Sequence, residues 1–444
     1  QSTVKILFLD IYKKSKSRIS KDTAGGYGTE NNLGDSLVGK LLSYVIKKTI
    51  FWPNLSFVQL MQEFKSRNYE VQYKKYIGTD PNIEGFDVIF VCNSIVCFET
   101  EIEAIQNILK NKKIPIFYCG AFGEFVKEKI PSNVNIVTGN YEFLLDYLEL
   151  NKLKFKDIFN IKYLKIHDGN SDKLSLIDWE SFNIEKTRNI ILGKNKNYFP
   201  FIATRGCPYS CREYCTYPLA QGIKVKRETI DITIDKLKQI SSKYKSPHIV
   251  FRDPVFSINI KKSKELLKKI GDANLNIEFS SELHLSNIDD EFLELCKYSK
   301  MNGLKFGIES SSEVVRDSVK RFSLTNDKQR TTINKIRDAG IKTVGMFILA
   351  QPSDTRETCL RTIDYSCSLN LDVAQYSIFT PYPGTPFYSK NSAKVNNTKY
   401  QNFNQYQLVY KHNSISANEA RELLDSAYKK FIISKVKNIF LKQN

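Results

Sequence analysis

Three cysteines within nine residues, Cys207, Cys211 and Cys215, form the strongest chemical pattern in this sequence. They follow an apolar, strand-like run that ends at Arg205-Gly206, so we expect one tight loop to carry all three thiols. Three thiolates from one loop are a soft, anionic ligand set, which suits an iron–sulfur cluster or zinc and does not suit magnesium or calcium. The alternative interpretation is three unrelated cysteines of a reduced protein, since free cysteine is often buried.

The sequence near this loop offers no fourth metal ligand. A closed structural zinc site uses four Cys or His ligands, whereas the nearest histidines, His167 and His248, are about 33 residues or more away. Three ligands without a local fourth fit a four-iron cluster in which one iron stays open to another molecule.

The cysteine loop resembles that of the radical S-adenosylmethionine (SAM) enzymes, and within them the group with an N-terminal cobalamin-binding-like domain. The resemblance covers roughly residues 3 to 390. It implies that the cysteines hold a [4Fe–4S] cluster, that SAM chelates the fourth iron, and that one-electron transfer cleaves SAM to a 5′-deoxyadenosyl radical. The family usually has three and then two residues between the cysteines. Here there are three and three, with an aromatic residue, Tyr214, before the third cysteine as in several cobalamin-type members.

Length and composition describe an ordinary globular protein. The chain of 444 residues is 41% hydrophobic and 26% charged, which predicts two or three domains with ample core. No stretch approaches the ~20 apolar residues that cross a bilayer, and the first residues lack the pattern of a signal peptide. Because the nine cysteines show no disulfide framework, we expect a cytoplasmic location.

The formal net charge of +18 raises the question of a nucleic-acid partner. Lysines are spread along the chain, and acidic residues are interspersed among them. The clearest excess lies in residues 391–444, with nine Lys or Arg against three Asp or Glu. We interpret it as a solvated basic face and expect no nucleic-acid partner.

Residues 1–150 alternate strand-like and helix-like segments, which predicts a doubly wound, Rossmann-like α/β domain. The first strand is the apolar run Val4 to Asp10, and a Gly-rich loop over residues 24–29 follows it. A helix begins near Leu55, and another spans about residues 100–111. Further strands are expected at residues 70–73, 87–92 and 114–118. Ligands of such domains bind beyond the carboxyl ends of the strands.

The resemblance implies that this domain binds cobalamin through loops at its strand ends. The residues assigned to cobalamin on this basis are Gly26, Tyr27, Gly28, Thr29, Trp52, Asn93, Ser94, Gly120 and Glu142. The Asp-x-His-x-x-Gly motif that supplies a cobalt ligand in many cobalamin proteins is absent, and the first histidine of the chain is His167. Cobalt would therefore receive no His ligand from this domain. The alternative is a degenerate domain that keeps the fold without cobalamin.

Residues 151–198 are interpreted as a linker, and residues 199–390 as a partial (β/α)₆ barrel of the TIM type. Strands are expected at 199–203, 248–251, 277–280, 303–306, 343–349 and 373–379. In such barrels the chemistry lies at the carboxyl ends of the strands. The cysteine loop follows the first strand, so we expect the other site residues at the ends of the next strands.

Carboxylates and other polar residues do follow these strands. The resemblance assigns Asp253, Glu282, His284 and Glu309 to SAM, and Gln351, which follows the fifth strand, is also assigned to SAM. Asp253 or Glu282 would accept hydrogen bonds from the SAM ammonium group. Glu309 would bind the ribose hydroxyls, and Tyr214 would support the adenine. Taken singly, Asp253 could instead pair with Arg252, and Glu309 could cap a helix.

Residues 391–444 are expected to form a helical extension. Ser416-Ala417-Asn418-Glu419 is a capping box that begins a helix. Its apolar residues Leu423, Leu424 and Phe431 share one face, so we expect the helix to close the open side of the barrel.

The resemblance implies a cobalamin-dependent radical SAM enzyme that methylates an unactivated carbon of a small molecule or natural product. Such an enzyme needs an external electron donor of the flavodoxin or ferredoxin type. The alternatives are a radical SAM cyclase, oxidase or rearrangement enzyme of the same architecture, a nucleic-acid-modifying radical SAM enzyme, and a non-catalytic electron carrier.

Overall fold

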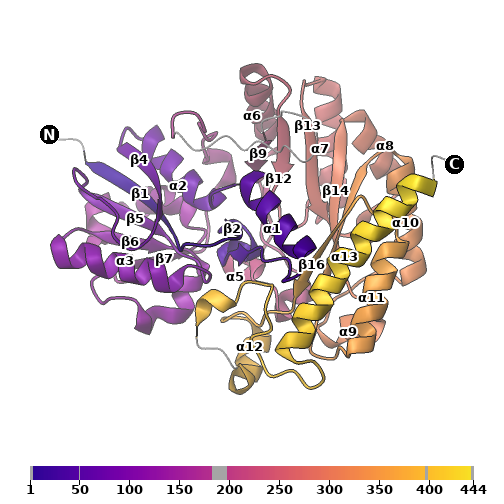
Figure 1. Ribbon diagram of the computed structural model, residues 1–444. Coiled ribbons are helices and arrows are strands. Elements are labelled where there is room, and N and C mark those ends of the chain that lie inside the picture. Colours follow the sequence, from indigo (N-terminus) through magenta and orange to yellow (C-terminus); the bar gives the residue numbers. More distant parts are fainter. Residues whose placement is uncertain (1–3, 50, 183–197, 396–398, 442–444) are drawn as a thin grey trace.

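Two parallel six-stranded sheets, one from each half of the chain, frame the molecule in the computed structural model (Figure 1), which describes residues 4–49, 51–182, 198–395 and 399–441. The first sheet has the order β4-β1-β5-β6-β7-β8. Its strands are β1 (Lys5–Tyr12), β4 (Glu70–Ile77), β5 (Val88–Cys92), β6 (Ile116–Cys119), β7 (Asn135–Gly139) and β8 (Tyr163–Ile166).

Helices cover both faces of the first sheet, as the predicted doubly wound fold requires. Ile6 and Phe8 of β1 pack in the cluster that includes α2 (Leu55–Ser66) and α4 (Leu144–Leu150). Leu7 and Leu9, which alternate with them, pack in the cluster that includes α3 (Phe98–Asn111). The apolar run therefore reads as a strand because both of its faces are buried.

The segment expected to be a linker contributes to this sheet. β8 pairs in parallel with β7 and forms the edge of the sheet, and Leu174 and Phe182 are buried in its core. A strand of only four residues, alternately buried, leaves too short a pattern to separate from a loop. Residues 183–197 of the expected linker lie outside the described residues.

The second sheet is a half-barrel with the order β16-β15-β14-β13-β12-β9, and the strands expected here are all confirmed. They are β9 (Tyr198–Phe201), β12 (His248–Phe251), β13 (Glu278–Leu283), β14 (Met301–Glu309), β15 (Lys342–Leu349) and β16 (Val373–Ile378). The helices along this half are α6 (Ile230–Lys243), α7 (Ile260–Ala273), α8 (Asp290–Tyr298), α9 (Glu313–Ser318), α10 (Asn326–Asp338), α11 (Arg356–Ser368) and α12 (Pro386–Asn391).

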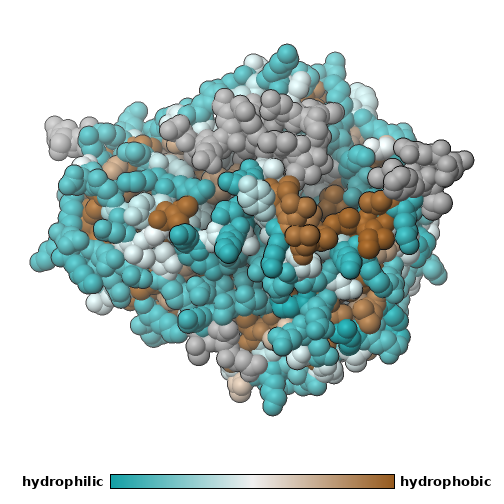
Figure 2. Space-filling view, viewed as in Figure 1, coloured by the Kyte–Doolittle hydropathy of each residue, from teal (hydrophilic) through white to brown (hydrophobic). Residues whose placement is uncertain are grey.

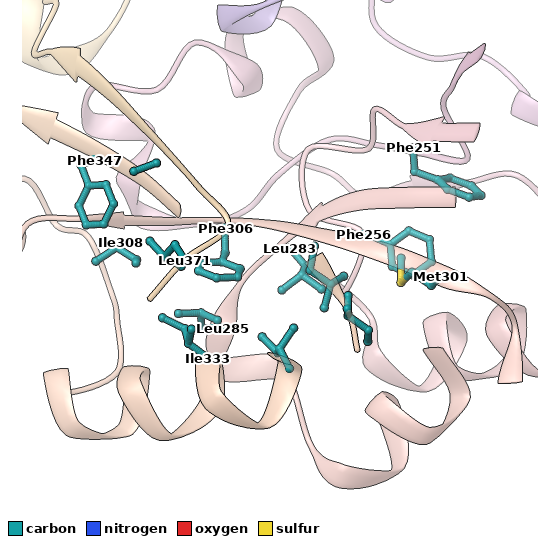
Figure 3. Packing of buried hydrophobic residues seen from close by; sticks show 14 of the residues in the cluster. Phe251, Phe256, Leu283, Leu285, Met301, Phe306, Ile308, Ile333, Phe347 and Leu371 are labelled. Atoms are coloured by element: carbon teal, nitrogen blue, oxygen red, sulfur yellow. The ribbon is translucent and has the colours of Figure 1, made fainter. Parts of the chain in front are cut away.

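Alternation along β14 decides which of its side chains enter the barrel. Phe306 and Ile308 point to the helical layer, where they pack near Ile333 of α10 (Figure 3). Successive side chains of a strand point to opposite faces, so Lys305 and Glu309 point to the interior of the barrel.

The last helix, α13 (Ala417–Leu441), closes the half-barrel at β16 as expected. Its capping box is present, because the Ser416 amide donates to Glu419 at 2.8 Å and the Glu419 amide donates to the Ser416 hydroxyl at 3.2 Å. Tyr428 donates from its hydroxyl to the carbonyl of Tyr376 in β16 at 3.0 Å. No helix among the described residues is long and apolar enough to cross a bilayer.

One helix, α1 (Leu37–Thr49), lies in a segment where no helix was expected. Ser36, just before it, donates to Asp425 of α13 at 2.7 Å, which joins the N-terminal half of the chain to the last helix. The outer side of α1 is apolar, with Leu37 and Leu41 exposed, and Figure 2 shows apolar side chains gathered on this face near α13. Apolar residues of α1 thus lie on its exposed side as well as its packed side. Their spacing in the sequence therefore lacks the single apolar face that is typical of a helix packed on a core.

Short elements complete the region between the two sheets. They are β2 (Ile19–Ser20), the 3₁₀ helix η1 (Ala24–Gly26), β3 (Thr29–Glu30), β10 (Thr204–Arg205), the 3₁₀ helix η6 (Ser210–Glu213), α5 (Tyr217–Gln221) and β11 (Lys226–Arg227). All of them lie in loops that leave the carboxyl ends of β1 and β9, so the functional ends of the two sheets face each other.

Two ion pairs cross between the domains at this junction. Arg205 donates to Glu142 at 2.7 Å, and both side chains are almost fully buried. Arg252, after β12, pairs with Asp22 of the loop after β1 at 3.0 Å. These contacts fix the start of the cysteine loop against the first domain.

Replacing Glu142 with Gln should lower the free energy of unfolding by about 3–5 kcal/mol, because it leaves the buried Arg205 charge uncompensated. The measurement is denaturant unfolding of the variant. Glu357→Gln is the control, since Glu357 forms an exposed pair with Arg361 that is worth at most ~1 kcal/mol. Equal stability of the two variants would show that the interdomain pair does not hold the domains together.

Candidate active site

The cysteine loop folds back on itself through backbone contacts. Gly206 has φ +86°, and a Cβ atom there would lie 2.1 Å from the carbonyl oxygen of Lys224. The Cys207 amide donates to the carbonyl of Gly222 at 3.1 Å, and the Cys215 amide donates to that of Cys211 at 3.0 Å. The returning segment after α5 therefore packs against the loop and holds its thiols on one side.

All three cysteines border one cavity of about 290 Å³ at the mouth of the half-barrel. The cavity also touches the first domain through Arg18, Ala24 and Thr29, among others. The Gly-rich segment after β1 is thus brought opposite the cysteine loop.

The thiols differ in how readily they ionise. A hydrogen bond with Cys215 lowers the pKa of Cys211 to about 6, assisted by the Arg321 guanidinium, whose Nη1 is 4.0 Å from the Cys211 sulfur. The same hydrogen bond, together with burial, raises the pKa of Cys215, and burial raises the pKa of Cys207. Cys211 is therefore the thiol that ionises first, and the other two need a bound cation to ionise at neutral pH.

The thiol donors of this cavity suit an iron–sulfur cluster. Across the described residues no three His, Cys, Asp or Glu side chains are grouped closely enough to hold one metal ion. In a [4Fe–4S] cluster each cysteine binds a different iron, so the sulfurs surround a larger body. The donor chemistry and the shared cavity therefore fit a cluster with one iron left open.

Four of the residues assigned to SAM border the same cavity, namely Tyr214, Glu282, His284 and Glu309. Burial raises the pKa of the Glu309 carboxyl to about 7. Its residue has φ +68°, a conformation that turns the chain at the end of β14. The carboxylate thus lies at a strand end, as expected, in a dry site that favours a cationic ligand.

His284 is held by its neighbours. Its Nε2 donates to the carbonyl of Phe322 at 3.0 Å, so its Nδ1 accepts from the Ser286 hydroxyl at 2.6 Å. Burial lowers the pKa of His284 to about 4. The ring is therefore neutral at neutral pH and forms a fixed wall of the cavity.

Two residues assigned to SAM lie outside the lining of this cavity. Asp253 accepts the amide hydrogen of Ala203 at 2.8 Å and is buried beneath the cysteine loop. Gln351 is fully buried, and its side chain donates to the carbonyl of Ile348 at 3.1 Å. Both side chains turn into the protein at the strand ends and do not border the cavity, and their assignment to SAM stays a prediction.

Arg321 is a site residue that sequence reasoning missed. It lies 3.5 Å from Glu309, donates to the carbonyl of Gly307 at 2.9 Å and borders the cavity next to Cys211. Arg321 follows α9, and it neither ends a predicted strand nor belongs to a recognisable motif. Its place in the site becomes visible only because the chain returns across the mouth of the barrel after α9. A guanidinium there is suited to bind a carboxylate.

Three of the nine residues assigned to cobalamin border a smaller cavity of about 40 Å³ at the carboxyl edge of the first sheet. Gly26, Gly120 and Glu142 border it, together with Asn54 and Asn140. Asn93 lies against Gly120, donating to its carbonyl at 3.0 Å. The edge is therefore lined by glycines and amide groups.

Other residues assigned to cobalamin are engaged within the protein. Tyr27 donates to the carbonyl of Pro383 at 2.6 Å, and Ser94 donates to Glu101 at 2.7 Å. Gly28 packs against Val96, and Thr29 borders the larger cavity. Trp52 is half-buried, with its ring 6.0 Å from the Arg252 guanidinium.

A buried ion cluster occupies the space between the ends of β1 and β5. Lys21 pairs with Glu101 at 2.8 Å and with Asp10 at 3.1 Å, and all three side chains are fully buried. In doubly wound sheets this crevice, where the strand order reverses, is the usual ligand site. Here the protein fills it, which leaves the neighbouring glycine-lined edge as the open position.

A half-barrel with three cysteines and facing carboxylates at its mouth defines the radical SAM class. Consistent with this, residues 201–366 match the model of the radical SAM superfamily, and this part of the chain is a radical SAM domain. The whole described fold is also similar to solved structures. The radical SAM methyltransferase TsrM from Kitasatospora setae, with cobalamin and a [4Fe–4S] cluster bound, gives a TM-score of 0.62 at 12% identity, covering 96% of this chain and 89% of that one.

Another solved structure and two curated relatives are also similar to this chain. The cobalamin-dependent radical SAM enzyme OxsB gives a TM-score of 0.59 at 14% identity, covering 97% of this chain and 56% of that one. An uncharacterised methyltransferase of Pyrococcus horikoshii is 26% identical over 54% of this chain and 53% of its own length. Bacteriochlorophyllide d C-12(1)-methyltransferase of Chlorobaculum tepidum is 23% identical over 49% and 48%. The chain thus has the fold of cobalamin-dependent radical SAM enzymes, and it spans about half the length of the curated relatives it matches.

Replacing Cys207, Cys211 or Cys215 singly with Ala should abolish assembly of a four-iron cluster, because no other thiol borders the cavity in the described chain. Iron and sulfide content and the visible absorption of anaerobically reconstituted protein measure this. Cys367→Ala is the matched control and should retain the full cluster. A full cluster in any of the three loop variants would exclude that cysteine as a ligand.

Proposed function

We propose that this protein is a cobalamin-dependent radical SAM enzyme that methylates an unactivated carbon of a small-molecule substrate. The observation that carries the proposal is the convergence of three thiols, two carboxylates and Arg321 on one cavity at the barrel mouth. The fold shared with cobalamin-dependent enzymes and the relatives named as methyltransferases support it.

The side chains around the cavity match the polar groups of SAM. In this proposal Arg321 would bind the SAM carboxylate, and Glu282 would accept hydrogen bonds from its ammonium group. Glu309 is placed for the ribose hydroxyls, and the half-buried Tyr214 ring for the adenine. Together these residues would orient the sulfonium toward the thiols and exclude water from it. The cluster, when bound, supplies the electron that cleaves SAM.

The glycine-lined edge of the first sheet is the proposed cobalamin position. Asn93 Oδ1, Asn140 Oδ1 and Trp52 Nε1 are buried polar atoms without a hydrogen-bond partner in the described chain, and the amide groups on the rim of a corrin can pair with them. His167 is exposed and does not border this cavity, so we expect no His ligand to cobalt. Because the cavity is only about 40 Å³, a corrin requires η1 and α5 to move apart.

Anaerobic turnover tests the function. The reconstituted protein with SAM and reductant should form 5′-deoxyadenosine, and added methylcobalamin should be retained through gel filtration and support formation of S-adenosylhomocysteine. Deoxyadenosine without cobalamin retention would leave a radical SAM enzyme and remove the methyltransferase proposal. If the reduced protein leaves SAM intact, the radical SAM function is excluded and the electron-carrier alternative remains.

An electron donor is proposed to dock where the cysteine loop reaches the surface. Arg212 is exposed beside Cys211, and Lys320 and Lys390 pair with Glu213 at 3.1 and 2.7 Å while staying about 60% exposed. Three cations against one carboxylate favour an acidic partner such as a flavodoxin.

The nine free cysteines suit a reducing compartment, and we propose a cytoplasmic location.

Replacing Arg212 and Lys390 together with Glu should slow flavodoxin-driven SAM cleavage by about tenfold or more at low salt, because like charges then oppose docking. The rate with dithionite should not change. Lys342→Glu, on the exposed amino end of β15, is the control. An equal loss with both reductants would place these residues in the catalytic site and not in docking.

A further inference from the structure

Lys305 is a cation inside the barrel that the roles assigned above do not use. It lies in the middle of β14 and borders the large cavity. Glu282 is its register neighbour on β13, yet no carboxylate of the described chain lies within ion-pair distance of its ammonium group. Lys305 is half-buried, and this burial lowers its pKa.

Arg18 reaches the same cavity from the first domain. Its Nε donates to Asn31 Oδ1 at 2.9 Å, and Asn31 in turn donates to the Tyr406 hydroxyl at 2.7 Å. This chain of hydrogen bonds holds the guanidinium in place, but it gives the positive charge no counter-ion. Burial lowers the pKa of Arg18 as well, and no ion pair to Arg18 occurs in the described part of the chain.

The third nearby cation is already neutralised. Arg252 pairs with Asp22 at 3.0 Å and also donates to the Asp22 carbonyl at 3.2 Å. Lys305 and Arg18 are therefore the two positive charges that face this part of the cavity without a protein anion. Burying charge without a partner is costly, so a bound anion would offset that cost.

We propose that Lys305 and Arg18 together bind an anionic group, a carboxylate or a phosphate, of the enzyme's substrate. The proposal rests on the proposed function and names the substrate class. Met346 and Phe379 also border the cavity and supply apolar wall for the body of such a molecule.

The proposed anion site is distinct from the position assigned to the SAM carboxylate. Arg321 lies beside Cys211 and Glu309 at the carboxyl end of β14. Lys305 precedes Glu309 by four residues, which is roughly 13 Å along a strand. Glu282 lies next to Lys305, and once it accepts from SAM it is less available to neutralise the lysine.

The test uses the anaerobic, cluster-reconstituted full chain with saturating SAM, so that Arg321 is occupied. Equilibrium dialysis compares 2-naphthoate and 2-naphthyl phosphate with the neutral 2-naphthamide. At least one anion should bind about tenfold more tightly than the amide, and the preferred anion identifies carboxylate or phosphate. Lys305→Gln and Arg18→Gln should each remove this preference, whereas Lys305→Arg should retain most of it.

Lys342→Gln, an exposed lysine of the same barrel, is the matched control and should bind like the wild type, with thermal melting confirming that every variant is folded. The proposal is overturned if neither anion binds saturably, if the amide binds equally well, or if Lys305→Gln and Arg18→Gln keep the preference. SAM affinity separates the two sites, since Arg321→Met should weaken SAM at least tenfold and Lys305→Gln less than about twofold. Anion preference without any SAM cleavage in the wild type would refute the proposed function and keep the anion site.

Discussion

The contact between the carboxyl ends of two parallel sheets is the constraint on which the rest of this structure depends. Two ion pairs, Glu142–Arg205 and Asp22–Arg252, cross that contact in a largely dry environment. Such pairs tolerate little displacement, because separating them leaves charges buried without partners. Since Arg205 precedes Cys207 by two residues, the first domain helps to define where the thiols stand.

Burial also changes the pKa values of the ionisable groups that line the cavity. It raises the pKa of Glu309 to about 7 and lowers that of His284 to about 4, so the histidine is neutral and the carboxylate gains most from a cationic ligand. Arg321 favours the thiolate of Cys211. The cavity therefore combines two carboxylates and a thiolate-favouring cysteine with cations that come from other segments of the chain.

The first domain keeps the doubly wound fold but changes how its strand ends are used. Lys21, Asp10 and Glu101 fill the crevice at the reversal of strand order, so stability there comes from a paired ion cluster. The glycine-lined edge between η1 and α5 remains for a ligand. The crevice that usually binds a ligand is therefore filled by side chains in this protein, and fold alone does not define a site.

The sequence by itself determined the strands of the half-barrel, four of the six strands of the first sheet and the capped last helix, because hydrophobic periodicity and capping are local properties. It also determined the three-cysteine loop and the strand-end carboxylates Glu282 and Glu309. Only the tertiary structure decided that β8 belongs to the first sheet, that α1 is a helix, and that Asp253 and Gln351 turn inward. It alone brought Arg321, Lys305 and Arg18 to one cavity, since these cations come from three distant segments and no local pattern records which side chains meet across a fold.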